Sequence, residues 1–242
     1  MQFKQVIRST LMNTLILCCL LAISAPSLYA LSIDDHEMFV HPFLAHMGLP
    51  ERQNEVNLRI TSIQIRDNGE VKGDLAVHIE AGLVDKLGLH IRSDGVQSED
   101  FSEIMLQYAV LADRTLSNGV SIFGQINFPT GPTTKDEVQG LIGISARLTA
   151  PDILTWDGNV HYNMQEAMIE LESSFVFRLN NRYYTVLETR GHLNDERELY
   201  ILPAMIFRID QGQSFGVGLQ VPVTDQREYD SQALFQYSVV FD

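Results

Sequence analysis

The chain has 242 residues, of which 45% are hydrophobic and 20% are charged, with 17 basic side chains against 31 acidic ones and a formal net charge of −14. The apolar fraction is too high, and the charged fraction too low, for an intrinsically disordered chain. The pI is near 4.8 and basic residues are not clustered, which argues against nucleic acid as a partner, since phosphate contact requires clustered Lys and Arg. We therefore expect one folded domain, or two at most.

The first 30 residues have the layout of a secretory signal peptide. Two basic residues precede an apolar stretch at about 11–23, and the small residue Ala30 closes the segment. The apolar stretch is shorter than the ~20 residues of a membrane-spanning helix. We predict cleavage after Ala30, which removes both cysteines, Cys18 and Cys19. The exported chain then has no disulfide, cysteine-bound metal or thiol nucleophile. Any residence in a membrane must be as strands.

From about Val56 to the end, apolar residues recur with a period of two, which is the period of a β-strand. The clearest segments are 120–128, 138–149, 167–178 and 214–223. Turn residues separate about twelve such strands, which begin near Val56, Val71, Leu87, Ile104, Val120, Val138, Val160, Ala167, Tyr183, Leu199, Phe215 and Leu234. Short links between most neighbours predict an antiparallel up-and-down meander. In the first strand the apolar phase slips between Ile60 and Ile63, which we attribute to a β-bulge.

Three architectures fit this meander: a soluble sandwich, a soluble ligand-binding barrel and an outer-membrane barrel. Export, the lack of disulfides and a final strand that alternates to Phe241 favour the membrane barrel, because this ending resembles the signal that outer-membrane barrels present to their assembly machinery. Aromatic residues near strand ends fit the girdles of such a barrel; they are Tyr108, Phe128, Tyr162, Tyr184 and Tyr237. A soluble periplasmic β-protein with the apolar faces inside remains the competing interpretation.

We accordingly divide the chain into a signal peptide at 1–30, an irregular N-terminal extension at 31–54 and a β-barrel at 55–242. The predicted fold class is all-β, an antiparallel up-and-down transmembrane β-barrel of about twelve strands. The predicted location is the outer membrane of a Gram-negative cell. The expected partners are outer-membrane lipids, the barrel-assembly machinery and a small-molecule solute, while the oligomeric state is left open.

Three segments resemble one known family. They are EAGLVDKLGL at 80–89, FGQINFPTG at 123–131 and GVGLQVPV at 216–223. They are similar to strand and turn motifs of the family labelled as the outer-membrane component of the MetA pathway of phenol degradation. The resemblance implies an outer-membrane, transporter-like barrel, with hydrophobic or aromatic solutes among the candidates. The family has no established catalytic residues to carry over.

Polar residues on one face of the predicted strands are candidates to line a lumen. The candidates are Lys72, Asp74, His78, Glu80, His90, Arg92, Arg147, Glu170, Glu172 and Arg178, and the same face continues with Glu103, Gln125, Gln139, His161 and Arg208. A mixed-charge lining selects solutes by sign and size in an open lumen. The alternative is a network of salt bridges that fills a narrow one.

Three evenly spaced histidines, His36, His41 and His46, lie in the N-terminal extension and have the ligand type for zinc or copper. A spacing of five matches neither a helix face nor a strand face, so the alternative is an extension lying over or in the barrel mouth.

The motifs of nucleophilic, metal-dependent and nucleotide-dependent enzymes are absent from the sequence. Ser145 and His161 are compatible with a hydrolytic site but do not form a diagnostic pattern. We therefore predict no enzyme activity and no cofactor. The expected function is passive passage of small solutes through a charged lumen.

Overall fold

The computed structural model describes residues 42–94, 101–113, 117–129, 138–150, 153–193, 198–210 and 212–241. The predicted signal peptide, His36 and His41 lie outside these ranges. Twelve strands follow one another: β1 (Val56–Asp67), β2 (Glu70–Val84), β3 (Leu87–Asp94), β4 (Phe101–Asp113), β5 (Asn118–Pro129), β6 (Gln139–Ala150), β7 (Leu154–Asn163), β8 (Met168–Arg178), β9 (Tyr183–Leu193), β10 (Glu198–Arg208), β11 (Gln213–Pro222) and β12 (Ser231–Phe241). Within the described ranges, no helix is long and apolar enough to cross a membrane.

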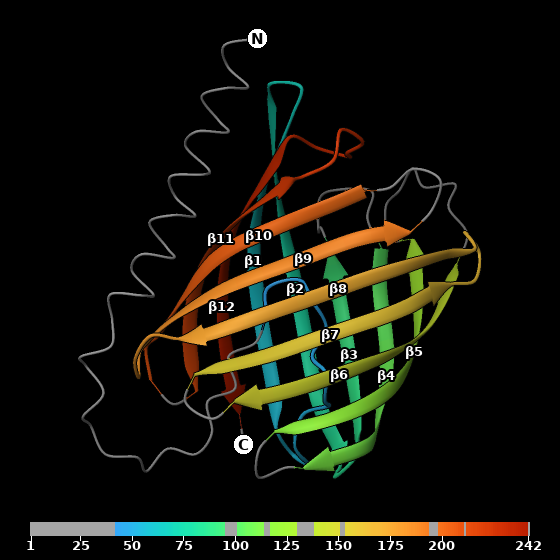
Figure 1. The fold of residues 1–242 in the computed structure, drawn as a ribbon, viewed down its shortest axis with the longest axis vertical. Coiled ribbons are helices and arrows are strands. Elements are labelled where there is room, and N and C mark those ends of the chain that lie inside the picture. The colour runs from blue at the N-terminus through green and yellow to red at the C-terminus, as the bar shows by residue number, and fades with distance from the viewer. Residues whose placement is uncertain are drawn as a thin grey trace.

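The strands form one closed barrel in which each strand pairs antiparallel with its neighbours in sequence (Figure 1). The barrel closes between β1 and β12, whose register runs from Val56 opposite Phe241 to Arg66 opposite Ser231. Closure leaves no unpaired sheet edge. The predicted fold class, an all-β antiparallel barrel of twelve strands, is confirmed.

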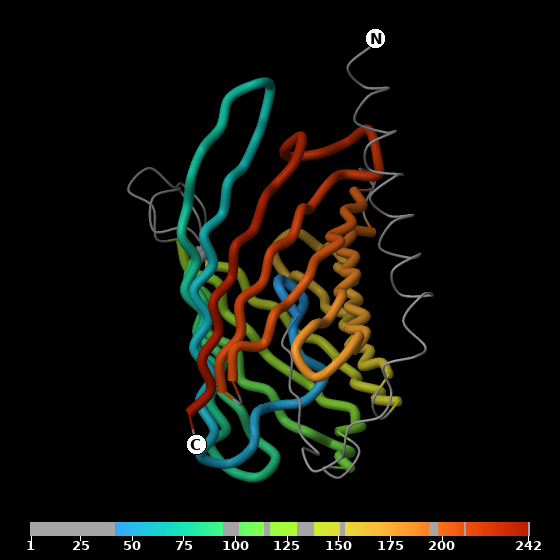
Figure 2. Tube along the Cα trace, turned by 90° about the vertical axis from the view of Figure 1, so that its left-hand side faces the viewer, coloured from blue at the N-terminus to red at the C-terminus, as the bar shows by residue number. Residues whose placement is uncertain are grey.

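The two ends of the barrel differ in their connections. At the end where β1 begins and β12 finishes, the connections are the short segments 85–86, 114–117, 151–153, 179–182 and 209–212. At the opposite end the connections include the longer segments 95–100, 130–138 and 223–230. The β1–β2 hairpin also projects from this second end, beyond the neighbouring strands (Figure 2). Connections that are short in sequence at one end and longer at the other are typical of outer-membrane barrels.

Burial in this barrel is the reverse of burial in a water-soluble protein. On β6, Ile142 and Ile144 point outward and are 54% and 56% exposed, while Ser145 and Arg147 point inward and are 1% and 2% exposed. Most other strands repeat this arrangement, with large apolar side chains outside and buried polar ones inside, whereas the inward row of β10 is largely apolar, with Leu202, Ala204 and Ile206 buried. The alternation predicted from the sequence therefore separates an apolar outer surface from a polar lumen.

Two predictions about individual positions are wrong. The first strand has no bulge, since β1 keeps an unbroken register with both β2 and β12. Ile60 faces outward, whereas Ile63 is 6% exposed and belongs to an apolar cluster inside the lumen, so the phase slip marks apolar lumen residues. Tyr184 is also buried in this cluster and takes no part in an outer girdle. The register shifts instead lie between Gly82 and Val84 and between Ala109 and Leu111.

Candidate functional site: a lumen occupied by the N-terminal segment

The segment at 42–55, which we call the plug segment, runs inside the barrel before β1 begins (Figures 1 and 2). Met47 and Leu49 are fully buried, and Glu51 is 1% exposed. Its end is fixed to β2, because Asn54 N donates to Gly82 O at 3.0 Å and Gly82 N donates to Glu55 O at 2.9 Å. The lumen of this barrel is therefore occupied by the chain's own N-terminal part.

Carboxylates on three strands accept hydrogen bonds from the backbone of the plug segment. Glu188 on β9 accepts from the N–H groups of Phe43, Leu44 and Ala45, the last two at 2.9 and 3.2 Å. Glu172 on β8 accepts from His46 N at 3.1 Å, and Asp157 on β7 accepts from Gly48 N at 2.7 Å. Hydrogen bonds to ionised acceptors are stronger than neutral ones.

The carbonyl groups of the plug segment are bonded from the remaining wall. Arg59 Nη1 donates to Pro42 O at 2.6 Å, and Arg92 Nη1 to Leu44 O at 3.4 Å. Neutral donors complete the set: Asn159 bonds His46 O, Gln107 bonds Met47 O, and Ser121 and Ser145 bond Gly48 O. The wall thus recognises mainly the backbone of this segment, which leaves few buried polar groups of the plug unsatisfied.

An apolar anchor accompanies these polar contacts. Phe43 is 4% exposed and packs in a cluster contributed by β1, β2, β8, β9, β10 and β12. The members of the cluster on the wall are Ile63, Ala76, Val176, Tyr184, Val186, Leu202, Ala204, Ile206 and Leu234. Full burial of a phenylalanine side chain stabilises by ~1.5–3 kcal/mol. Phe43 is therefore a hydrophobic anchor for a segment otherwise bound through its backbone.

His46 is the charged centre of the plug segment. Its Nδ1 lies 2.9 Å from Glu172 Oε2, and its Nε2 lies 3.8 Å from Glu103 Oε1. Burial alone lowers the pKa of His46, but the neighbouring Glu172 and Glu103 raise it more, so that the pKa rises to about 10. The ring also stacks on Phe123, with centroids 5.9 Å apart. His46 is consequently a cation at neutral pH, held between two carboxylates.

Charge pairs fill the wall around the plug. Arg147 makes a bidentate pair with Asp157, with distances of 2.7 and 2.8 Å. Glu170 Oε2 lies 3.3 Å from each of Arg190 Nη2, His161 Nε2 and His192 Nε2. These groups are the salt-bridge network that the sequence suggested as the alternative to an open lining.

Most of the predicted lumen candidates face the lumen. His78, Glu80, His90, Arg92, Arg147, Glu170 and Glu172 are all buried. Three candidates lie elsewhere. Lys72 is exposed and Asp74 half-buried on the part of β2 that precedes its pairing with β3. Arg178 is half-buried at the end of β8, where it donates to Asn181 Oδ1 at 2.5 Å.

Sequence reasoning missed Arg59, Asp157 and Glu188, each of which bonds the backbone of the plug segment. Two of them occupy positions that alternate onto the lumen side of their strand. Asp157 shares that face of β7 with His161, and Glu188 shares that face of β9 with His192. Of the proposed metal-binding histidines, only His46 lies in the described ranges, and it is paired with carboxylates. Metal binding by His36, His41 and His46 stays a prediction. Ser145 and His161 serve the plug and the Glu170 network, respectively.

Space remains beside the plug on two sides. One recess of about 10 Å³, which is room for roughly one water molecule, lies between the plug segment and β1, β2 and β3, and is lined by residues that include Phe43, Arg59 and His78. A second recess of about 10 Å³ lies toward β8–β11, next to Glu188 and Arg190. Leu44 lines both recesses and separates them.

Comparison with solved structures places the fold among outer-membrane channels. The COG4313 outer membrane channel from Pseudomonas putida F1 aligns with a TM-score of 0.58 and 8% identity, over 84% of this chain and 100% of that one. The NanC porin aligns with a TM-score of 0.56 and 9% identity, over 77% of this chain and 99% of that one. The KdgM porin aligns with a TM-score of 0.54 and 10% identity, over 78% of this chain and 98% of that one. No protein-family model and no curated protein matches the sequence, so the resemblance to the MetA-pathway family stays a prediction.

Proposed function

We propose that this protein is an outer-membrane channel for passive uptake of small solutes, closed at rest by its plug segment. The observation that carries the proposal is the combination of an apolar outer surface with a polar lumen whose side chains bind residues 42–48. A plug held by hydrogen bonds and one aromatic anchor can leave without unfolding the wall. Opening then exposes the charged lining along which solutes diffuse.

The outer surface supports residence in a lipid bilayer. Apolar side chains such as Ile144, Leu148 and Val160 are at least half exposed around the barrel, where a soluble periplasmic protein would leave them in contact with water. Outward-facing Phe235 and Tyr237 on β12 suit the predicted recognition by the barrel-assembly machinery. These features favour the outer-membrane interpretation over a soluble binding protein. Residence in the outer membrane requires export, which we assign to the predicted signal peptide at 1–30.

The lumen lining favours small hydrophilic solutes, and cations among them. Carboxylates outnumber guanidinium groups among the described lumen residues of the wall, which are Glu80, Glu103, Asp157, Glu170, Glu172 and Glu188 against Arg59, Arg92, Arg147 and Arg190. Departure of the plug removes His46 and the backbone N–H groups that now face several of these acids. The open lumen then carries excess negative charge, which attracts cations. Hydrophobic or aromatic solutes, which the family resemblance implies, are the alternative.

The test combines localisation with single-channel recording. Outer-membrane recovery and an unheated band that runs faster than the boiled band on a gel are expected for the wild type. In planar bilayers, Glu188→Gln should conduct more often than the wild type, because three plug N–H groups share the two carboxylate oxygens of Glu188 whereas Gln offers one acceptor oxygen, and each lost hydrogen bond contributes ~0.5–1.5 kcal/mol. Asp74→Asn, on the projecting hairpin, is the matched control and should behave as the wild type.

Two results would overturn the proposal. Recovery in the soluble periplasmic fraction without a mobility shift would exclude the membrane barrel. Equal and negligible conductance of wild type and Glu188→Gln, with the mobility shift retained, would exclude the channel while leaving the fold intact. Solute swelling assays with a cationic amine, a neutral sugar and an aromatic alcohol would then separate the solute classes.

A further inference from the structure

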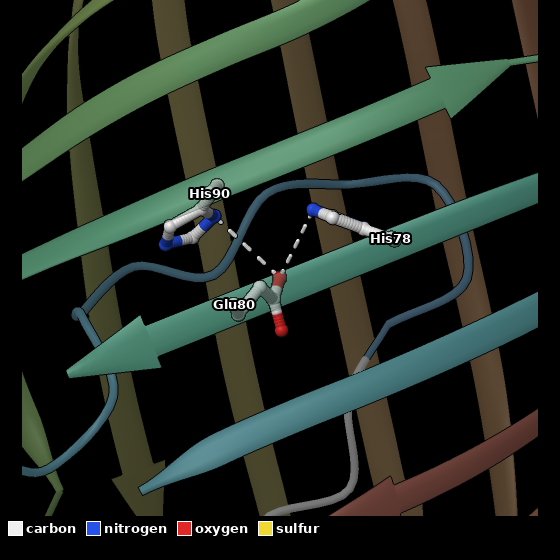
Figure 3. Close-up of side chains that lie close together, drawn as sticks. All are labelled: His78, Glu80 and His90. Atoms are coloured by element: carbon white, nitrogen blue, oxygen red, sulfur yellow. Dashed lines mark ion pairs between the residues drawn. The ribbon is translucent and has the colours of Figure 1, made fainter. Parts of the chain in front are cut away.

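Three metal-ligand side chains converge on the lumen side of β2 and β3 (Figure 3). His78 and Glu80 lie two residues apart on β2, and His90 lies directly opposite Glu80 on β3. One ligand atom from each lies within 4.8 Å of the other two, and all three side chains are buried. Among the described residues, no other His, Asp or Glu group meets this condition.

The distances are close to those of a preformed coordination sphere. Zinc binds imidazole nitrogen and carboxylate oxygen at ~2.0–2.2 Å, so two ligand atoms in a tetrahedral site lie roughly 3.3–3.5 Å apart. Glu80 Oε1 lies 3.5 Å from His78 Nε2 and 3.6 Å from His90 Nδ1. An ion can therefore sit between the carboxylate and both rings with only a small inward shift.

The ring of His90 supplies a second, independent observation. It is 2% exposed, and neither of its nitrogens has a hydrogen-bond partner among the described residues. A buried polar group without such a partner costs ~1–3 kcal/mol. His78 Nε2 is likewise without a hydrogen bond in the described part of the chain. A metal ion bound to these nitrogens removes that cost at both rings.

Neighbouring groups orient the carboxylate and set the charge. Asn57 Nδ2 donates to Glu80 Oε2 at 3.0 Å, which fixes the carboxylate and leaves Oε1 directed at the histidines. Arg59 Nη2 donates to Oε1 at 2.6 Å and also contacts His78 Nδ1. A metal on His78 Nε2 requires the ring proton on Nδ1, so Arg59 must leave this nitrogen. The bond from Arg59 to Pro42 O is made by Nη1 and does not involve the nitrogen that contacts His78.

We propose that His78, Glu80 and His90 form a binding site for a divalent first-row transition metal, with Zn²⁺ as the probe. Two imidazoles and one carboxylate leave a fourth position for water or a solute donor. His78 also lines the recess beside Phe43 and Arg59, so the site lies next to the path of the proposed channel. It is distinct from the predicted cluster of His36, His41 and His46.

The experiment is a Zn²⁺ titration of the full mature protein, folded in detergent and freed of metal with a chelator. Calorimetry should give one site. His78→Ala and His90→Ala each remove a ligand and should lower the affinity for Zn²⁺. The fall should exceed the ~10–100-fold that loss of an outer-sphere partner costs. His161→Ala is the matched control, since His161 is also a buried lumen histidine beside a glutamate. Its affinity for Zn²⁺ should equal that of the wild type.

Equal affinity of the wild type, His78→Ala and His90→Ala would overturn the proposal, as would loss of binding in His161→Ala alone. If a ligand variant loses the heat-dependent mobility shift and so fails to fold, Cu²⁺ bound to a folded variant with His36→Ala, His41→Ala and His161→Ala decides the matter by electron paramagnetic resonance. Coupling to two nitrogens supports the site, and an oxygen-only signal contradicts it. Conductance in bilayers without any Zn²⁺ binding would contradict the metal site and leave the proposed function unaffected.

Discussion

The ring of Phe43 packs directly on the backbone of Gly216 in β11, so closely that a Cβ atom at position 216 would lie 2.4 Å from Phe43 Cζ. A side chain at this position must therefore displace the aromatic anchor of the plug. Overpacking of this kind costs ~1–3 kcal/mol. We expect Gly216→Val to raise the open fraction of the channel by roughly 5–150-fold, which corresponds to that range of free energy. Planar-bilayer recording measures this fraction.

Gly124 in β5 provides the control for that substitution. A Cβ atom at position 124 would meet nothing within 4 Å, and the residue faces outward. Gly124→Val should leave the open fraction unchanged. Equal behaviour of the two valine variants would show that Phe43 does not hold the plug.

Arginine on the outer face separates a lipid environment from water. Ile144 is 56% exposed in the middle of β6. At the midplane of a bilayer, Ile144→Arg should lower the free energy of unfolding by ~2–4 kcal/mol. Leu193→Arg, at the end of β9, should lower it by ~0–1 kcal/mol. In a water-soluble barrel both substitutions would stay within ±0.5 kcal/mol, roughly the range of ordinary surface changes. Urea unfolding in lipid vesicles measures the difference, and two equally small effects would argue against the membrane.

The pair of Arg147 and Asp157 predicts a strong single-site effect. Both side chains are fully buried, and Asp157 also accepts from Gly48 N. Asp157→Asn removes the charge partner of Arg147 and should destabilise the fold by ~3–5 kcal/mol, as breaking one side of a buried pair does. The double change Arg147→Met with Asp157→Leu should recover part of that loss. Fluorescence of Trp156, the one tryptophan of the chain, follows unfolding next to this pair.

The raised pKa of His46 predicts a dependence on alkaline pH. Because its pKa in the folded state is about 10, above the ordinary 6.5, the stabilisation by Glu172 and Glu103 is complete below pH 6.5 and is lost as pH rises toward 10. The plug should therefore loosen, and conductance rise, between these values. His46→Gln should remove this step. A step that persists unchanged in the variant would assign the titration to another group.

The strand pattern was predictable from sequence because each strand has one lipid-side and one lumen-side row, and strand order follows from short links. Starts predicted near Val56, Leu87 and Tyr183 coincide with those of β1, β3 and β9. The period of two also placed Glu170 and Glu172 together on the lumen side. These features depend on local patterning, which a single sequence contains.

The plug contacts were not predictable in the same way. Glu188 contacts residues about 145 positions earlier in the chain, and local periodicity has no information about such pairings. The inward Ile63 also broke the polar pattern, because it packs against a segment whose position inside the barrel was unknown. Lys72 and Asp74 alternate in phase with the lumen residues of β2. Alternation alone does not tell where along a strand the barrel wall ends.

Residues 42–48 are bonded by side chains of eight strands, β1 and β3–β9, and so connect most of the barrel wall from within. The pairing of β1 with β12 joins the two ends of the barrel sequence, so closure waits until every strand is present. Loop-closure entropy opposes such distant pairings. A segment that contacts eight strands at once offsets part of that cost. Residues 42–48 thus favour a barrel of this circumference over misassembled sheets.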